Sequence, residues 1–220
     1  MSASQQHGFT WENSVLKDVY QIKPGSQKGG YTRQHDVTAE ENMLDYVNVS
    51  IKTSGSTSVD MGDARRVFQS VSSGESLTLL VLQYSQEDGE EEKEAIKTLR
   101  NVLEVDLTGS SELLFAHLSL ENITELHEFL KAIPAGKATD AIVAEYKKKA
   151  QQLNLYSGAI HMRPKVDSHT QRRLQCSFPN INDFCKKYPK RLLSQSTVGL
   201  YKGVQLPLQI ASCRRIRHLI

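Results

Sequence analysis

An acid, a hydroxyl and an amine stand at spacings that can bring them together. Asp36 is followed, after thirteen intervening residues, by Ser50 and, two positions later, by Lys52. From Tyr46 to Thr53 apolar residues alternate with small or polar ones, which predicts a half-buried strand. Ser50 and Lys52 then share its polar face, where a lysine either reaches solvent or meets an anion.

A second short strand is expected from Thr32 to Ala39, and it carries Asp36. If the two strands pair as a hairpin whose turn is centred near Leu44, Asp36 lies opposite Lys52. Phosphodiester hydrolysis uses such groups, because carboxylates bind the divalent cation and a lysine stabilises the developing charge. The alternative is a surface hairpin with an ordinary cross-strand ion pair.

The pattern Asp36…Ser50-Ile51-Lys52 resembles the D…(D/E/S)xK motif of the PD-(D/E)xK, restriction-endonuclease-like nucleases. Glu12, in a predicted helix, stands where many members keep an N-terminal glutamate, although an acid in a first helical turn is also favoured by the helix dipole. The chain departs from the motif at Ser50, which replaces the usual second acid. It also has Arg66 fourteen residues after the lysine, so Asp63 or Asp60 would have to supply that acid.

The resemblance implies a role for each of these residues. Asp36 would coordinate Mg²⁺ with the assistance of Asp63 or of Glu12. Lys52 would orient or activate the attacking water, and Ser50 would bind water or a metal-bound ligand. The resemblance further implies a type II restriction endonuclease that cuts double-stranded DNA as a homodimer on a palindrome. The alternative role for Asp63 is to cap the helix that follows it.

The net charge of +2 conceals an asymmetry along the chain. Residues 151–220 contain 12 Lys and Arg but only 2 acids, whereas the first 150 residues contain 15 Lys and Arg and 23 acids. A basic segment of this kind predicts an acidic partner such as nucleic acid. No apolar run approaches the length of a membrane span and no secretory signal is evident, so a cytoplasmic protein without membrane contact is expected.

A basic hairpin is expected within this segment, from strands at 158–162 and 172–178. Arginine and glutamine can read guanine and adenine edges in the major groove. Residues of the hairpin therefore form the predicted DNA-binding set: Lys165, Gln171, Arg172, Arg173 and Gln175. Alternation along the strand would point Gln171, Arg173 and Gln175 one way and Arg172 the other. A hairpin that touches only the phosphate backbone is the alternative.

The remaining pattern predicts an α/β fold with a restriction-endonuclease-like mixed sheet flanked by helices. A buried strand is expected at 77–84, a small polar loop at 53–62, a helix from Asp88 to about Leu103, and helices at 119–133 and 140–153. We expect a nuclease core in residues 1–155 and a β-rich basic lobe in 156–220. The rival functions are an inactive nucleic-acid-binding relative and a structure-selective repair or phage nuclease.

Overall fold

A computed structural model describes residues 10–23, 35–88, 94–166 and 172–213. The chain divides into two compact units, and each is built from separate segments. Unit 1 contains residues 1–57, 76–106 and 187–220, and unit 2 contains 58–75 and 107–186. This division differs from the expected boundary at residue 155, since residues 156–220 contribute to both units. No helix among the described residues is long and apolar enough to cross a membrane.

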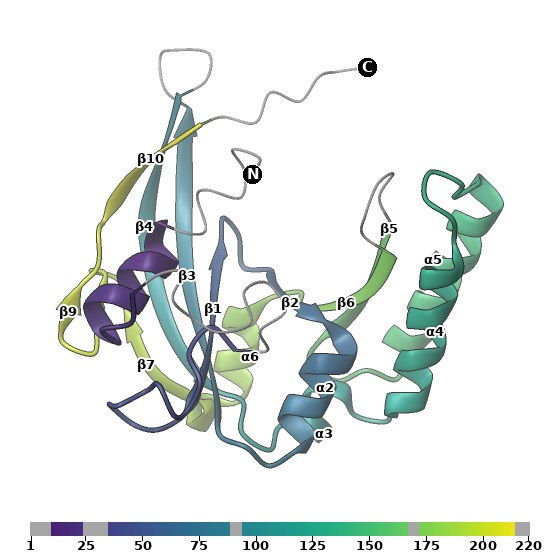
Figure 1. The fold of residues 1–220 in the computed structure, drawn as a ribbon, viewed down its shortest axis with the longest axis horizontal. Coiled ribbons are helices and arrows are strands. Elements are labelled where there is room, and N and C mark those ends of the chain that lie inside the picture. The colour runs from purple at the N-terminus through teal and green to yellow at the C-terminus, as the bar shows by residue number, and fades with distance from the viewer. Residues whose placement is uncertain (1–9, 24–34, 89–93, 167–171, 214–220) are drawn as a thin grey trace. The chain divides into compact units, whose positions relative to one another are not determined.

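Unit 1 is organised around a five-stranded mixed sheet. Its strands are β1 (Asn48–Ser54), β3 (Leu77–Asp88), β4 (Glu94–Asp106), β7 (Leu192–Ser196) and β10 (Gln209–Cys213). The order is β1-β3-β4-β10, and β7 also pairs with β4. β1 runs parallel to β3, and the other pairs are antiparallel. The long pair β3 and β4 forms the centre of this sheet (Figure 1).

A helical segment covers one face of this sheet. Residues 10–14 are α-helical, and the turn then widens into the π-helix η1 (Val15–Val19). Trp11, Val15 and Leu16 are buried against Val49 and Ile51 of β1, together with Leu80 and Leu82 of β3. Trp11 also donates its Nε1 hydrogen to the carbonyl of Pro207, at 2.7 Å. The apolar face of β1 is therefore core, and Ser50 and Lys52 point away from it.

Smaller elements complete unit 1. The 3₁₀ turn η3 (Pro189–Arg191) precedes β7, and the strands β8 (Leu200–Tyr201) and β9 (Val204–Gln205) form a hairpin around Lys202 and Gly203. A buried polar network joins this hairpin to β4. Tyr201 donates to Glu104 Oε1 at 3.1 Å, and Lys202 Nζ lies 3.0 Å from the same oxygen.

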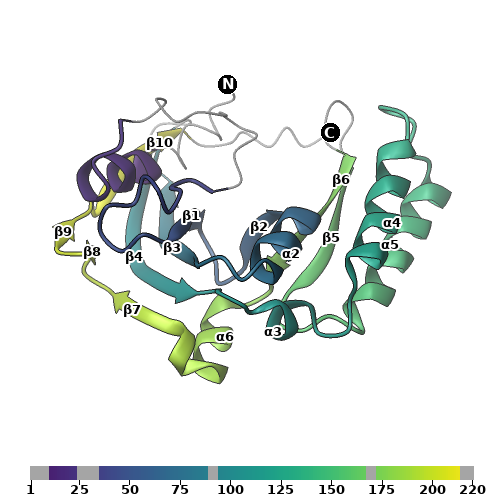
Figure 2. The ribbon, with the colours of Figure 1, turned by 60° about the horizontal axis from the view of Figure 1, so that its bottom comes forward.

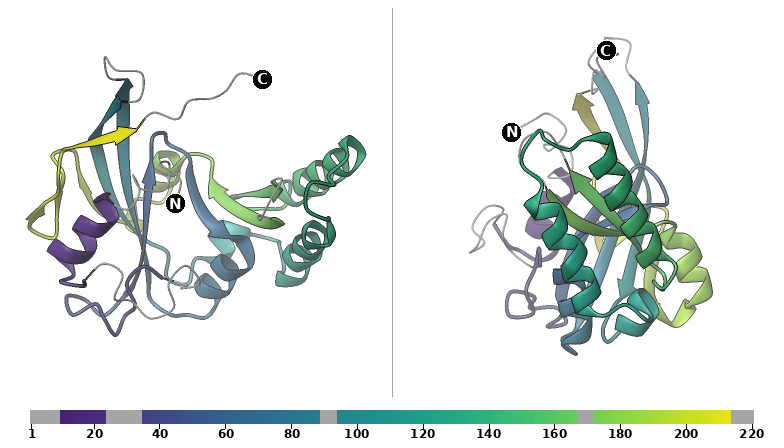
Figure 3. Two further views of the ribbon diagram at one scale, coloured as in Figure 1. Left: turned by 45° about the horizontal axis from the view of Figure 1, so that its top comes forward. Right: turned by 90° about the vertical axis from the view of Figure 1, so that its right-hand side faces the viewer.

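Unit 2 is a three-stranded antiparallel sheet with helices. β2 (Val59–Asp63), β6 (Arg172–Phe178) and β5 (His161–Val166) pair in that order. Its helices are α2 (Ala64–Ser72), α3 (Ser111–Phe115), α4 (Leu120–Ala132), α5 (Asp140–Asn154) and α6 (Ile181–Lys187). Helices α4 and α5 pack on β6 and β5, as Figures 2 and 3 show. The expected basic hairpin is thus the pair β5 and β6.

Several predicted elements are confirmed. β3 begins at Leu77 as expected, α4 covers the helix expected at 119–133, and α5 covers the helix expected at 140–153. The caps explain these boundaries, because the hydroxyl of Ser119 accepts from Asn122 N, and Thr139 does the same for Ile142 N.

Two predicted elements are wrong. The expected helix from Asp88 to Leu103 is largely strand β4, whose residues pair with β3 along most of its length. The polar stretch 53–62, expected to be loop, contributes Val59 and Met61 to β2, where both are buried. A bulge between Asp60 and Gly62 breaks that strand's register, and Gly62 takes the positive φ of 89° there.

Candidate active site

Asp36 is held against β1 by three donors that share one of its carboxylate oxygens. Oδ2 accepts from the backbone N–H of Ile51 at 2.6 Å, from Ser50 Oγ at 3.4 Å and from Lys52 Nζ at 3.5 Å. Among the described residues, no donor contacts Oδ1 of Asp36. One oxygen therefore fixes the carboxylate, and the other can accept a ligand.

The backbone explains this arrangement. Val37 and Val49 form an antiparallel bridge, in which Val49 N donates to Val37 O at 2.8 Å. The bridge confirms that the Asp36 segment pairs with β1, although it aligns Asp36 with Ser50 rather than with Lys52 as expected. Lys52 reaches Asp36 by the length of its side chain. The part of the expected strand before residue 35 lies outside the described residues.

The ion pair of Asp36 and Lys52 contributes little to stability. Both side chains are 27 % exposed and the atoms are 3.5 Å apart, so solvent screens the attraction. Pairs of this kind contribute about 0–1 kcal/mol. A cation and an anion that face partly into water and stabilise the fold weakly are available for chemistry.

Glu12 belongs to the same cluster. Burial and, after it, the charge of Asp36 raise its pKa from 4.5 to about 7, against the charge of Lys52, which lowers it. Glu12 therefore lies within electrostatic reach of both residues, so the N-terminal helix brings a second carboxylate to Asp36. A cation bound near Glu12 would favour its ionised form, because an opposite charge stabilises a carboxylate.

The chemistry of these donors fits Mg²⁺. In proteins this ion keeps several waters and is bound through one or two carboxylates plus substrate phosphates. Asp36 through Oδ1 and Glu12 provide two carboxylates. The described residues contain no group of three or more His, Cys, Asp and Glu that could enclose a metal ion. Two carboxylates are within the number that a magnesium site completed by waters and substrate uses.

Asp63 has another contact set. It belongs to unit 2, where its Oδ1 accepts from the backbone N–H groups of Arg65 at 3.0 Å and Arg66 at 3.3 Å. Asp63 is therefore the N-cap of α2, as the sequence suggested. Its Oδ2 lies 3.7 Å from Nδ1 of the buried His127. A contribution of Asp63 to metal binding stays a prediction.

The predicted DNA-binding residues are engaged in different ways. Gln175 is only 7 % exposed, and its amide is satisfied when Nε2 donates to Asp60 Oδ2 at 3.2 Å and Oε1 accepts from Arg173 Nη2 at 2.9 Å. Arg173 and Gln175 thus share a face, as alternation predicts. Arg172 donates from Nη1 to the carbonyl of Ile133 at 2.8 Å.

These contacts restrict what the hairpin can read. Gln175 would have to leave its partners to reach a base edge, which disfavours its predicted role. Lys165 is half-buried and lies opposite Arg173 in the β5–β6 register. Gln171 lies outside the described residues. Contact of this hairpin with nucleic acid stays a prediction.

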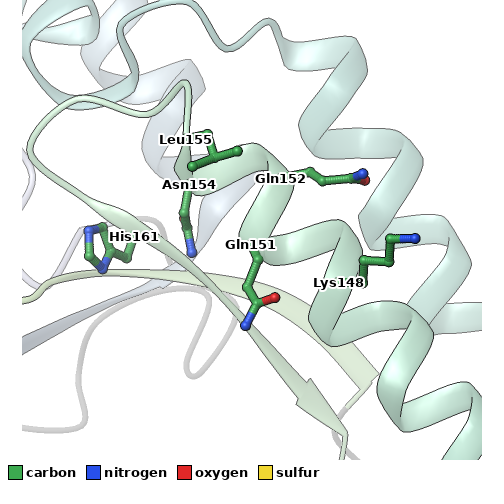
Figure 4. A pocket seen from close by; sticks show the side chains of 6 residues that line it. All are labelled: Lys148, Gln151, Gln152, Asn154, Leu155 and His161. Carbon is green, nitrogen blue, oxygen red and sulfur yellow. The ribbon is translucent and has the colours of Figure 1, made fainter.

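A separate depression of about 560 Å³ lies on unit 2. Figure 4 shows its lining side chains, which come from the last part of α5 and the first residue of β5: Lys148, Gln151, Gln152, Asn154, Leu155 and His161. Asn154 is already paired, since its Oδ1 accepts from Met162 N and its Nδ2 donates to Met162 O. None of the predicted site residues lines this depression.

One polar feature near the site was not predicted. On the face of the sheet that carries Ser50 and Lys52, three side-chain amides form a row across β7, β4 and β3: Gln195, Asn101 and Gln83. The signal in the sequence was a glutamine inside the apolar run of β3.

Comparison with protein-family models, curated proteins and solved structures gives no match to this chain.

Proposed function

We propose that this protein is a metal-dependent nuclease that hydrolyses DNA phosphodiester bonds. The observation that carries the proposal is the cluster in unit 1. Ser50 and Lys52 contact Asp36 directly, and the charges of Asp36 and Lys52 both shift the pKa of Glu12. These are four residues that the nuclease motif assigns to catalysis, and they come from segments separated by up to forty residues of chain.

Each side chain suits a step of phosphodiester hydrolysis. Mg²⁺, when bound, supplies positive charge to the phosphoryl oxygens and acidifies a water. Asp36 and Glu12 hold the cation site. Lys52 places an ammonium beside the attacking water and the charge that develops on the phosphorus oxygens. Ser50 Oγ donates to Asp36 and keeps that carboxylate oriented.

The order of elements in unit 1 also supports the proposal. A helix bearing Glu12 is followed by the Asp36 bridge, by β1 with Ser50 and Lys52 and, after residues 58–75 of unit 2, by β3 parallel to β1. The resemblance implies a mixed sheet flanked by helices for the nuclease core, and the sheet of unit 1 is mixed. We therefore propose the restriction-endonuclease-like fold for the core, and a type II restriction enzyme acting as a homodimer as the subtype.

The test is incubation of the protein with plasmid DNA in Mg²⁺ or in EDTA. We expect discrete fragments in Mg²⁺ and intact plasmid in EDTA. Lys52→Ala and Asp36→Ala should each lower the cleavage rate by about 10²–10³-fold, since removing one group that stabilises transition-state charge costs that much. Lys17→Ala, which removes an exposed lysine of the same unit, is the matched control and should cleave normally.

The outcomes separate the rival functions. A smear in place of fragments would indicate a nuclease that does not read sequence, including a structure-selective one. Binding without cleavage in any divalent metal would indicate an inactive nucleic-acid-binding relative. Cleavage by Lys52→Ala at the wild-type rate would remove the proposed active site.

A further inference from the structure

The amide row on the sheet of unit 1 has a fixed direction. Gln195 Nε2 donates to Asn101 Oδ1 at 3.2 Å, and Asn101 Nδ2 donates to Gln83 Oε1 at 3.1 Å. Because Asn101 donates to the oxygen of Gln83, the Nε2 hydrogens of Gln83 must point elsewhere. The three amide dipoles therefore align, and the positive end of the row is Gln83 Nε2.

That positive end has no partner. Gln83 is 8 % exposed, and its Nε2 is buried without a hydrogen-bond acceptor among the described residues. An unpaired buried donor costs free energy, and native proteins keep few of them, often at functional sites. By contrast, Gln195 Nε2 donates to Asn101, and Asn101 Nδ2 donates to Gln83, so both of these amide nitrogens have a partner.

The row ends beside the candidate active site. In the parallel register of β1 and β3, Lys52 pairs with Val81 and Ser54 pairs with Gln83, so Gln83 and Lys52 share one face of the sheet. Strands are about 4.8 Å apart and rise about 3.3 Å per residue, which puts the Cα atoms of Gln83 and Lys52 roughly 8 Å apart. Two long side chains at that separation can contact the same oxyanion group.

We propose that Gln83 is a substrate-binding residue: its Nε2, closed to solvent in the free protein, turns toward Lys52 on binding and donates to a phosphate oxygen of the nucleic-acid backbone held there. This inference rests on the proposed function. It adds a neutral hydrogen-bond donor, the amide of Gln83, to the cationic donor of the proposed active site, the ammonium of Lys52. The aligned amides favour an anionic acceptor, because each donor in the row polarises the next. A phosphate bound there would also take up the donor that the described residues leave unpaired.

The first experiment measures affinity for a short DNA duplex in Ca²⁺ at one salt concentration. Gln83→Met keeps the length of the side chain and removes the donor, and we expect its Kd to rise tenfold or more. Gln86→Met, three residues along the same strand at an exposed position, is the matched control and should bind as the wild type does. Equal Kd values for Gln83→Met and the wild type would overturn the inference.

The second experiment uses the wild-type chain, so that it does not depend on the folding of a variant. The side-chain NH₂ signals of Gln83, assigned by their loss in Gln83→Met or by sequential methods, are followed during titration with the duplex and, separately, with inorganic phosphate. We expect both probes to shift them. If the duplex is bound and these signals stay in place, the inference is wrong while the proposed function stands.

The titration with inorganic phosphate also tests the role of Gln83 if the proposed nuclease function proves wrong. If the wild type neither binds nor cleaves nucleic acid, the nuclease proposal fails. A shift of the Gln83 signals in inorganic phosphate would then still support an anion-binding donor at this position, and unchanged signals would overturn it.

Discussion

Replacing Glu12 by glutamine should stabilise the folded protein at alkaline pH. The pKa of Glu12 is raised from 4.5 to about 7, first by burial and then by Asp36. Between these two values the folded chain holds a proton that the unfolded chain has lost. The stability that this carboxyl contributes is complete below pH 4.5 and is lost as the pH rises through 7.

The magnitude follows from the shift. Each pKa unit corresponds to about 1.4 kcal/mol, so ionising Glu12 in the folded state costs on the order of 3 kcal/mol above pH 7. Glu12→Gln cannot ionise and escapes that cost. We therefore expect the variant to exceed the wild type in free energy of unfolding by up to about 3 kcal/mol at pH 8, and the difference to vanish near pH 4.

Urea denaturation of both proteins across pH 4 to 8, without divalent metal, measures this difference. Glu125→Gln, which removes an exposed glutamate from α4, is the control and should follow the wild type. Adding Mg²⁺ at pH 8 should stabilise the wild type more than Glu12→Gln, because only the wild type offers the second carboxylate. Parallel stability curves for wild type and Glu12→Gln would refute the assigned environment of Glu12.

Three further results are expected. Asp63→Asn should unfold at nearly the wild-type urea concentration while Asp63→Ala loses about 1 kcal/mol, since asparagine caps helices as aspartate does; a raised Mg²⁺ requirement for cleavage by Asp63→Asn would instead show a metal role. Lys202→Met should lose roughly 3 kcal/mol in the same assay because it leaves Glu104, 9 % exposed, without its cation, and an unchanged midpoint would contradict the buried network. Binding to a DNA duplex should weaken steeply with salt, with a slope of about 0.9 per phosphate neutralised, and a flat response would count against the basic residues of 151–220 as the DNA surface.

Local pattern predicted the parts of the fold in which burial and sequence agree. β1 alternates as its sequence does, and Val49 and Ile51 are buried while Ser50 and Lys52 are half-buried. The same reasoning failed for β4, which was expected to be a helix. Its buried positions include Lys97, whereas Ile96 is 48 % exposed, so the apolar residues do not mark the strand's inner face.

The candidate site was predictable where it is local. Asp36 meets β1 through a short connection, and the spacing to Lys52 indicated it. The position of Glu12 depends on the packing of Trp11 and Val15 against β1, which no local pattern encodes. The orientation of the Gln83 amide depends on its hydrogen bond with Asn101, eighteen residues away in sequence. Its position beside Lys52 depends on the order of the strands. The positions of Glu12 and Gln83 therefore could not be predicted from the sequence, because they depend on contacts between distant segments.

The segmented construction of unit 1 has a consequence for synthesis. When residue 186 leaves the ribosome, β1, β3 and β4 have all emerged, but β7 and β10 have not. Both missing strands pair with β4, on the edge that faces away from β3. A nascent chain of that length carries a long strand with unpaired N–H and C=O groups, which is a template for association with other chains. Strands translated after residue 186 are therefore the ones that close this sheet edge, and chaperone dependence should fall when they emerge.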